Sequence, residues 1–157
     1  MTDLNATRFK PIEILLAEDN PGDARLTLEG FKDARVRNKI SVVEDGFEVM
    51  AYLRGEGPYA DAAVPDLILL DLNMPKKDGR EVLAEIKADE NLRHIPVLVF
   101  TVSSADKDIL EAYSLQASAY ITKPIDFGDF LRVINSLTDF WLTIVKLPQR
   151  PASNPNV

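Results

Sequence analysis

Charged and hydroxyl side chains stand where several apolar runs of this sequence end. They are Glu18 and Asp19 after "IEILLA", Asp71 at the end of "DLILLD", Thr101 at the end of "PVLVFT", and Lys123 after "SAYIT". Three carboxylates close together repel one another and favour a hard divalent cation with oxygen ligands, for which Mg²⁺ is the natural candidate. A carboxylate can also act as a nucleophile that forms an acyl phosphate, while a cation and a lysine ammonium neutralise the phosphoryl oxygens. Brought together in space, these residues would form a phosphoryl-transfer site.

Each of these residues also has an ordinary explanation when it is taken alone. An acidic pair can cap a helix, and Asp71 can shape a turn. Thr101 suits a strand, and Lys123 can lie in solvent. The interpretation as a site therefore depends on the elements that would bring these residues to one edge of a sheet.

Short apolar runs alternate with helical patterns along the chain. Strands are predicted at 12–17, 39–44, 66–71, 96–101 and 118–122, and helices at about 22–34, 46–54, 80–88, 105–116 and 126–147. This alternation is typical of an α/β domain with a doubly wound, five-stranded parallel sheet and five helices. In such sheets the site lies beyond the carboxyl ends of the strands, which is where the charged residues fall.

The composition limits the possible functions. The 157 residues are expected to form one domain, and a net charge of −7 argues against binding to nucleic acid. No apolar stretch is long enough to span a membrane, no signal peptide is visible, and the absence of cysteine excludes disulfides and thiolate catalysis. We therefore expect a cytoplasmic protein. The only histidine, His94, precedes a predicted strand, and without a G-x-S-x-G motif it gives little support to a Ser-His-Asp hydrolase.

Four segments carry a resemblance to a known family. "AEDN", "LLDLNMPKKDG", "VFT" and "ITKP" resemble, in order and spacing, the signature segments of bacterial and archaeal response-regulator receiver domains. The similarity extends over residues 12–137. It implies the flavodoxin-like receiver fold. We expect a receiver domain at 8–148 that ends in an extended helix. Flexible tails are expected at 1–7 and 149–157, the second of which contains the polar, proline-rich segment "RPASNPNV".

The resemblance also implies roles for the acidic residues. Asp71 would be the phosphoacceptor, which takes its phosphoryl group from a sensor histidine kinase. Asp19 would bind Mg²⁺ directly, and Glu18 would contribute charge or a water-mediated contact. Asn73 would offer its backbone carbonyl to the metal. The protein would then catalyse only its own phosphorylation and dephosphorylation.

Further roles concern the switch between the two states. The resemblance makes Thr101 the switch hydroxyl, Lys123 the counter-charge of the phosphoryl group, and Tyr120 the switch aromatic that turns inward as Thr101 moves. The bond between Lys123 and Pro124 is expected to be cis, as in the family. Val102 departs from the family pattern, where a smaller residue is common, and its bulk is expected to hinder phosphodonors or water.

Two other kinds of function are compatible with parts of this pattern. Hydrolases that form an aspartyl phosphate have a second aspartate two residues after the nucleophile, and Asn73 occupies that position here. An interaction module that is never phosphorylated would usually lack part of the acidic set, which this chain retains.

The sequence after the receiver segment bears on how the protein would pass on its signal. No DNA-binding or enzymatic segment is recognised after the receiver segment, so we expect a stand-alone regulator that acts through protein contacts, like motility regulators or phosphorelay intermediates. "MPKKDGREVLAEIK", "RGEGPYADA" and "DFWLTIVKLP" are similar to response regulators associated with bacterial phytochromes. That resemblance extends to residue 148 and implies a phytochrome as the sensor kinase.

The last predicted helix carries two apolar sets. One stripe comprises Phe127, Phe130, Leu131, Ile134, Leu137, Trp141 and Val145, and a second set comprises Val133, Phe140 and Leu147. The first half of the stripe should pack on the sheet, while the last turns should run past it with nothing of their own to cover. We predict a homodimer with Phe140, Trp141, Leu147 and Pro148 near its centre. The alternative is that "FWLTIVKLP" folds back onto the domain.

Overall fold

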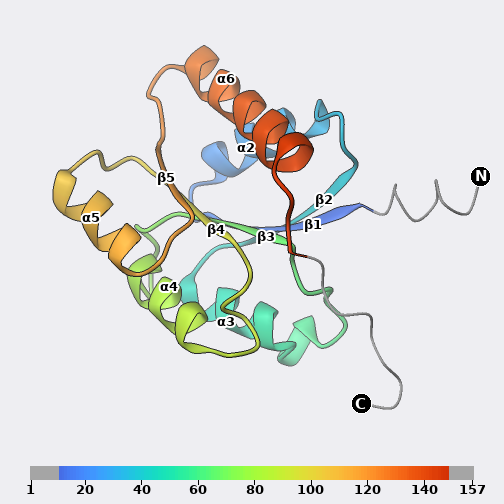
Figure 1. Cartoon of the computed structure of the whole chain (residues 1–157), viewed down its shortest axis with the longest axis vertical. Helices are drawn as coiled ribbons and strands as arrows, with labels where there is room; N and C mark the ends of the chain where they lie inside the picture. The colour runs from blue at the N-terminus through green and yellow to red at the C-terminus, as the bar shows by residue number, and fades with distance from the viewer. Residues whose placement is uncertain (1–10, 149–157) are drawn as a thin grey trace, which may run out of the picture.

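The computed structural model describes residues 11–148, apart from the side chain of Ile144, and Figure 1 shows the arrangement of its elements. The strands are β1 (Ile12–Ala17), β2 (Asn38–Val43), β3 (Leu67–Leu70), β4 (Val97–Thr101) and β5 (Ala119–Thr122). The helices are α2 (Pro21–Lys32), α3 (Gly46–Arg54), η1 (Gly57–Tyr59), α4 (Gly79–Ala88), α5 (Asp106–Ser114), α6 (Phe127–Leu137) and η2 (Thr138–Ile144). The tails predicted at 1–7 and 149–157 lie outside the described residues.

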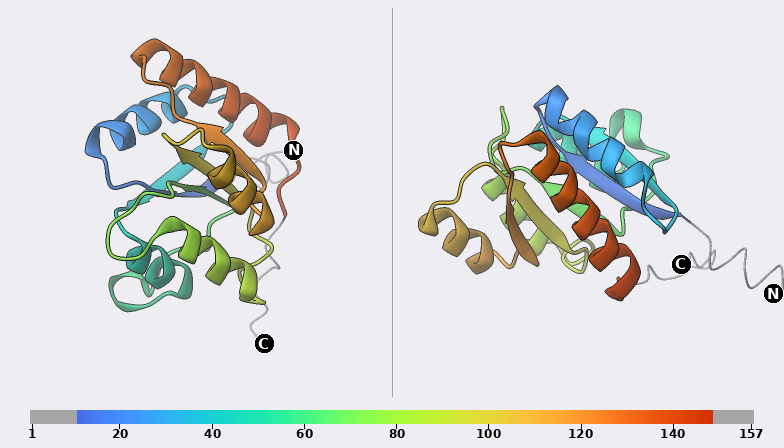
Figure 2. Two further views of the ribbon diagram at one scale, coloured as in Figure 1. Left: turned by 90° about the vertical axis from the view of Figure 1, so that its left-hand side faces the viewer. Right: turned by 90° about the horizontal axis from the view of Figure 1, so that it is seen from above.

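The sheet confirms the predicted fold class. Its strands are all parallel and lie in the order β2-β1-β3-β4-β5. Helices α2 and α6 cover one face, whereas α3, α4 and α5 cover the other (Figures 1 and 2). In the register of β1 and β3, Ala17 lies opposite Leu70. The acidic residues that follow these two positions therefore meet at the carboxyl edge of the sheet.

The central strand explains the long apolar run before Asp71. Successive residues of a strand point to opposite faces of the sheet. Leu67 and Leu69 join the apolar cluster under α2 and α6, and Ile68 and Leu70 join the cluster under the other three helices. All four residues are buried, so β3 has no polar face and ends on a charge only where it leaves the core.

The end of the last helix differs from the prediction. After α6 the chain continues as the π-helical segment η2, and the backbone amide of Val145 donates to the carbonyl of Phe140 at 2.9 Å, which is an i→i+5 bond. The predicted helix to 147 is therefore wrong in both length and pitch. Thr138 donates its hydroxyl to a backbone carbonyl at the transition, and Pro148 disfavours helix in the residue before it.

The wider turn changes which side chains are buried. Ile134 and Leu137 lie in the core as predicted, but the next core residue is Leu142, five positions after Leu137 and 6% exposed. Leu147 is half-buried and packs against the same cluster. The last turns thus cover part of their own domain, contrary to the prediction. Phe127, also predicted to pack on the sheet, is 63% exposed.

None of the helices between residues 11 and 148 combines the length and the apolar character needed to cross a membrane.

Candidate functional site

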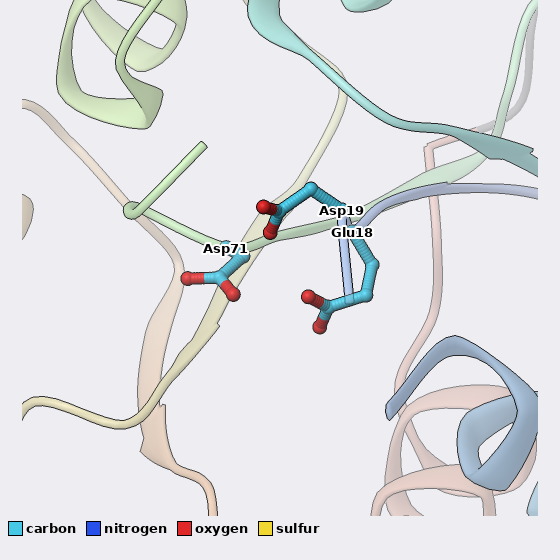
Figure 3. A group of neighbouring side chains, drawn as sticks. All are labelled: Glu18, Asp19 and Asp71. Atoms are coloured by element: carbon cyan, nitrogen blue, oxygen red, sulfur yellow. The ribbon is translucent and has the colours of Figure 1, made fainter. Parts of the chain in front are cut away.

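Three carboxylates converge at the carboxyl edge of the sheet. Glu18 and Asp19 directly follow β1, and Asp71 directly follows β3. One ligand oxygen from each of them can be chosen so that all three lie within 4.8 Å of one another. Figure 3 shows the three side chains around one shared space. Glu18 and Asp71 are buried and Asp19 is exposed, so the group has an open side.

The donor set fits a hard divalent cation. Magnesium binds oxygen at about 2.1 Å, so ligands on opposite sides of the ion lie about 4.2 Å apart. The spacing of the three carboxylates is compatible with that geometry. The predicted contact from the Asn73 carbonyl stays a prediction.

Lys123 extends from the end of β5 into this group. Its ammonium lies 2.5 Å from Glu18 Oε1 and 2.7 Å from Asp71 Oδ2. A third carboxylate, that of Asp23 in the first turn of α2, lies at 3.0 Å. Lys123 is therefore not the solvated lysine of the ordinary explanation. No motif of the sequence points to Asp23, which falls within the helix predicted at about 22–34.

The charges in this cluster do not balance, because three carboxylates share one ammonium. Burial by itself would lower the pKa of Lys123, but hydrogen bonds and charges from Asp71 and Glu18 outweigh it and hold that pKa above its ordinary value. Burial raises the pKa of the Glu18 carboxyl to about 7, against the opposing effect of its ion pair with Lys123. Lys123 therefore stays charged, while Glu18 gives up its proton less readily than a free glutamate.

Asp71 is held on both of its oxygens. The oxygen that does not face Lys123, Oδ1, accepts a hydrogen bond from the backbone amide of Asn73 at 3.0 Å. The side-chain amide of Asn73 donates to the hydroxyl of Thr101 at 3.3 Å. Thr101 is buried at the end of β4. The structure thus brings Asp71, Asn73, Thr101 and Lys123 together, as the pattern of strand ends predicted.

Gly79, at the start of α4, lies directly against the backbone of Asp71. A Cβ atom on Gly79 would lie 2.5 Å from the Asp71 carbonyl oxygen and 2.6 Å from Leu72 Cα. Contacts this short cannot be relieved by turning a side chain, because both atoms belong to the backbone. The glycine of "PKKDG" is therefore a packing requirement of the site, and sequence reasoning had assigned it no role.

Comparisons with known proteins agree with this geometry. The model of the response regulator receiver domain family matches residues 14–135. Response regulator Rcp1 of Synechocystis sp. is 43% identical over 138 residues, which cover 88% of this chain and 94% of Rcp1. The chain belongs to the response-regulator receiver family.

Solved receiver structures are similar over the same range. The phosphorylated cyanobacterial phytochrome response regulator RcpA has a TM-score of 0.86 and 47% identity, with 89% of this chain and 100% of RcpA covered. The Mn²⁺-bound form of Rcp1 has a TM-score of 0.86 and 42% identity, with 88% of this chain and 100% of Rcp1 covered. The predicted similarity to phytochrome-associated regulators is confirmed.

In this receiver domain the predicted switch aromatic is half-buried. Tyr120 donates its hydroxyl to the backbone carbonyl of Ser103 at 2.8 Å. The Ser103 hydroxyl in turn donates to Asp108 at 2.5 Å. The loop that follows Thr101 is therefore tied both to β5 and to α5. Movement of Tyr120 on phosphorylation stays a prediction.

Asp108 belongs to a second ion cluster of the receiver, which sequence reasoning missed. We call it the Arg80 cluster. It comprises Arg80 and the carboxylates of Asp78, Asp108 and Glu111. The guanidinium lies 2.9 Å from Asp108 and 2.7 Å from Glu111, and so joins the start of α4 to α5.

One prediction about the receiver backbone is wrong. The bond between Lys123 and Pro124 is trans, since no peptide bond between residues 11 and 148 is cis. Even before proline, the trans form is favoured by about 0.5–1 kcal/mol. Here the backbone amide of Lys123 donates to the Thr101 carbonyl at 2.7 Å and the ammonium reaches its carboxylates in the trans form. Val102 is exposed beside Thr101, and its effect on access stays a prediction.

Proposed function

We propose that this protein is a response regulator that accepts a phosphoryl group on Asp71 from the phosphohistidine of a sensor histidine kinase, in a reaction that needs Mg²⁺. The observation that carries the proposal is the environment of Asp71. Its carboxylate lies 2.7 Å from the Lys123 ammonium and within one metal-ligand cluster with Glu18 and Asp19. A buried carboxylate with these neighbours is suited to attack phosphorus and to remain bonded to it.

The step exchanges one bond for another. An Asp71 carboxylate oxygen forms a bond to phosphorus as the bond from phosphorus to the histidine nitrogen breaks, and the electron pair leaves with the imidazole. When bound, Mg²⁺ supplies positive charge to the phosphoryl oxygens. Lys123, whose ammonium already faces Asp71, supplies the second positive charge. Asn73 holds the other Asp71 oxygen through its backbone amide.

The response would pass through the loop after β4. Thr101 is buried next to the site, and its hydroxyl oxygen accepts a long contact of 3.3 Å from the side-chain amide of Asn73. The same hydroxyl can donate its hydrogen to a phosphoryl oxygen on Asp71. A shift of Thr101 would move Ser103, to which the Tyr120 hydroxyl is bonded. Partner proteins would read this rearrangement on the α5 and β5 side of the domain.

The test of the nucleophile is the variant Asp71→Asn. With Mg²⁺ and acetyl phosphate, the parent should take up one base-labile phosphoryl group per chain, and the variant should take up none while it keeps its circular dichroism spectrum. Asp61→Asn, a change at an exposed aspartate, is the matched control and should be labelled like the parent. Undiminished labelling of Asp71→Asn would refute the assignment.

The metal is tested separately. Asp19→Asn removes the exposed carboxylate of the cluster, and calorimetric titration should show weaker Mg²⁺ binding because a ligand and its charge are both lost. Thr101→Ala should leave that binding nearly unchanged while the response at Tyr120 is lost. Equal Mg²⁺ affinity of Asp19→Asn and the parent would mean that Asp19 is not a ligand.

We also propose a phytochrome as the sensor kinase. The support is the similarity to RcpA, a cyanobacterial phytochrome response regulator. Phosphotransfer from a panel of purified kinases, phytochromes among them, tests this. Faster transfer from a non-phytochrome kinase would contradict it.

Finally, we propose that the protein forms a homodimer through the end of its last helix. Phe140 is 50% exposed and contacts the ring of Trp141 edge-on, with centroids 5.9 Å apart. Both residues line a shallow hollow of about 350 Å³ beside Val133 and Leu137. Leu147, partly covered by its own core, and exposed Pro148 follow on the chain.

Sedimentation equilibrium decides between dimer and monomer. Phe140→Asp should give a folded monomer, because it places a charge inside the proposed contact. Leu110→Asp, at an exposed apolar residue of α5, is the matched control and should remain a dimer. A parent protein that is monomeric at about tens of micromolar, where a modest interface shows, would contradict the proposal.

A further inference from the structure

Asp23 is a carboxylate of the Lys123 cluster that the proposed reaction does not use. A lysine ammonium has three hydrogens to donate, and here it has three carboxylate neighbours. Two of them, Glu18 and Asp71, belong to the metal-ligand group, whereas Asp23 does not. Asp23 lies in the first turn of α2, a hundred residues before Lys123 in the sequence.

Lys123 does not need Asp23 in order to stay in place. Its contacts with Glu18 and Asp71 are shorter, at 2.5 and 2.7 Å against 3.0 Å, and both of these partners are buried. Asp23 is half-exposed, with its side chain at the edge of the site.

The side chain of Asp23 is not required for the shape of α2 either. It is the backbone amide of Asp23 that donates to the capping side chain of Asn20, and the backbone carbonyl that accepts from the Thr27 hydroxyl. Replacing the carboxylate by an amide preserves both bonds. It removes a favourable acid from the first turn of the helix, which is a small effect.

What Asp23 does add is negative charge. With every carboxylate ionised, Glu18, Asp19, Asp23 and Asp71 carry four negative charges against one positive charge on Lys123. When a divalent cation is bound and all four carboxylates are ionised, the site still carries one net negative charge. A phosphodonor that is itself a dianion must approach against that excess.

We propose that Asp23 is a specificity-determining residue, whose charge slows the phosphorylation of Asp71 by small, free, dianionic phosphodonors. A donor presented on a protein surface binds through contacts remote from the phosphoryl group, and those contacts offset the repulsion. A small acyl phosphate has no such contacts. Asp23 thereby favours a protein-bound phosphohistidine, and this inference rests on the proposed function of Asp71.

The experiment compares Asp23→Asn with Glu29→Gln, which removes one negative charge from the same helix at an exposed residue paired with Lys32. Two donors are used at saturating Mg²⁺. With acetyl phosphate, Asp71 oxygen bonds to phosphorus and acetate leaves with the electron pair of the broken P–O bond. With phosphoramidate, which carries less net negative charge, the P–N bond breaks and ammonia leaves.

The second-order rate constant of labelling by acetyl phosphate should rise about threefold to tenfold in Asp23→Asn, as expected for loss of one charge several ångströms from a dianion. The gain should be smaller with phosphoramidate and should shrink as salt is raised to about 1 M, where the Debye length falls to about 3 Å. Glu29→Gln should match the parent. A purely structural role for Asp23 would instead lower the melting temperature without any donor- or salt-dependent gain.

The outcomes separate this inference from the function on which it rests. If the parent is labelled and Asp23→Asn is labelled at the same rate or more slowly, the proposed role of Asp23 is overturned while the proposed function of Asp71 stands. A parent that takes up no phosphoryl group from either donor overturns the proposed function and this inference with it. As a readout independent of labelling, Asp23→Asn should bind Mg²⁺ about twofold to fivefold more weakly in calorimetry, because its site is less negative; unchanged affinity contradicts the charge argument.

Discussion

Two clusters in this molecule each place one cation among three carboxylates, and they differ mainly in burial. Lys123 faces Glu18, Asp23 and Asp71, and the lysine side chain is 2% exposed. Arg80 faces Asp78, Asp108 and Glu111, and the arginine side chain is 26% exposed. The first cluster joins the ends of three strands to the first turn of α2, whereas the second joins the start of α4 to α5.

Burial decides what the same charges can do. Away from water the unbalanced negative charge of the Lys123 cluster is poorly screened, so it acts on any cation or anion that enters. At the Arg80 cluster water screens the charges, and the ion pairs contribute little to stability. The Arg80 cluster contributes mainly orientation, because the planar guanidinium holds several acceptors in fixed directions. One cluster is therefore suited to chemistry and the other to holding a loop.

The largest effect should follow removal of the buried cation. Lys123→Ala leaves carboxylates buried without a counter-charge, which typically costs about 3–5 kcal/mol. Urea unfolding without Mg²⁺ should show a loss of this size, and added Mg²⁺ should restore part of it by binding the native state. Lys76→Ala, at an exposed lysine 3.5 Å from Asp45, should change stability by less than about 1 kcal/mol. Equal losses of unfolding free energy in Lys123→Ala and Lys76→Ala would refute the difference expected between a buried and an exposed cation.

Gly79 is where the two clusters meet, because it contacts the Asp71 backbone and lies between Asp78 and Arg80 in the chain. In Gly79→Ala the new methyl group must displace backbone atoms, at a cost of about 1–3 kcal/mol. Labelling of Asp71 should slow as well. Gly128→Ala, where the nearest atom is a side-chain oxygen at 3.2 Å, is the control. Normal labelling of Gly79→Ala would show that the site tolerates a shifted α4.

A smaller effect is expected from the half-exposed cation. Arg80→Met should lower the free energy of unfolding by about 1 kcal/mol or less. It should change the NMR signals of Ser103 and Tyr120 more than those of residues around Lys123, because Asp108 links Arg80 to that loop. Arg54→Met, which removes another exposed arginine paired with two carboxylates, should leave those signals unchanged.

The smallest effect concerns pH. Hydrogen bonds from Ser103, and then from Arg80, lower the pKa of Asp108 below its ordinary value of 3.8. For a carboxyl with a lowered pKa, the stabilisation is present above pH 3.8 and is lost as the pH falls through the folded-state pKa. In NMR titrations Ser103→Ala should raise the pKa of Asp108 more than Arg80→Met does. Ser104→Ala should leave it unchanged, and the reverse order of the first two variants would contradict this assignment.

The parts of this structure that depend on short-range patterns were predictable. Apolar runs and helical periods predicted every strand to within one residue, and the polar residues after the strands marked the site. The contact of Asp23 with Lys123 joins positions a hundred residues apart, and no local pattern distinguishes Asp23 from an ordinary first-turn acid. The same holds for Arg80, whose partners in α5 were unknown until the helices were placed.

Other misses have local causes that the sequence does not display. A cis bond before Pro124 was expected from family resemblance, and the chain takes the trans form instead. No particular residue type marks the change to i→i+5 bonding after Leu137. The regular helical period was therefore predicted to continue beyond the point where the α-helix ends. As a result the burial of Leu142 was not predicted, whereas Trp141, which was predicted in the stripe, is partly buried against the same core cluster.

That π-helical segment has a consequence for how relatives of this protein are compared. A π turn contains one more residue than an α turn, so η2 behaves like a helix with an insertion between Leu137 and Val145. A homologue that ends in a regular α-helix would bury the residue four positions after its counterpart of Leu137, whereas this chain buries the fifth, Leu142. Ungapped alignment would therefore equate surface residues with core residues from here to the end of the helix. Surfaces in this region should be compared by superposition, with the extra residue placed explicitly.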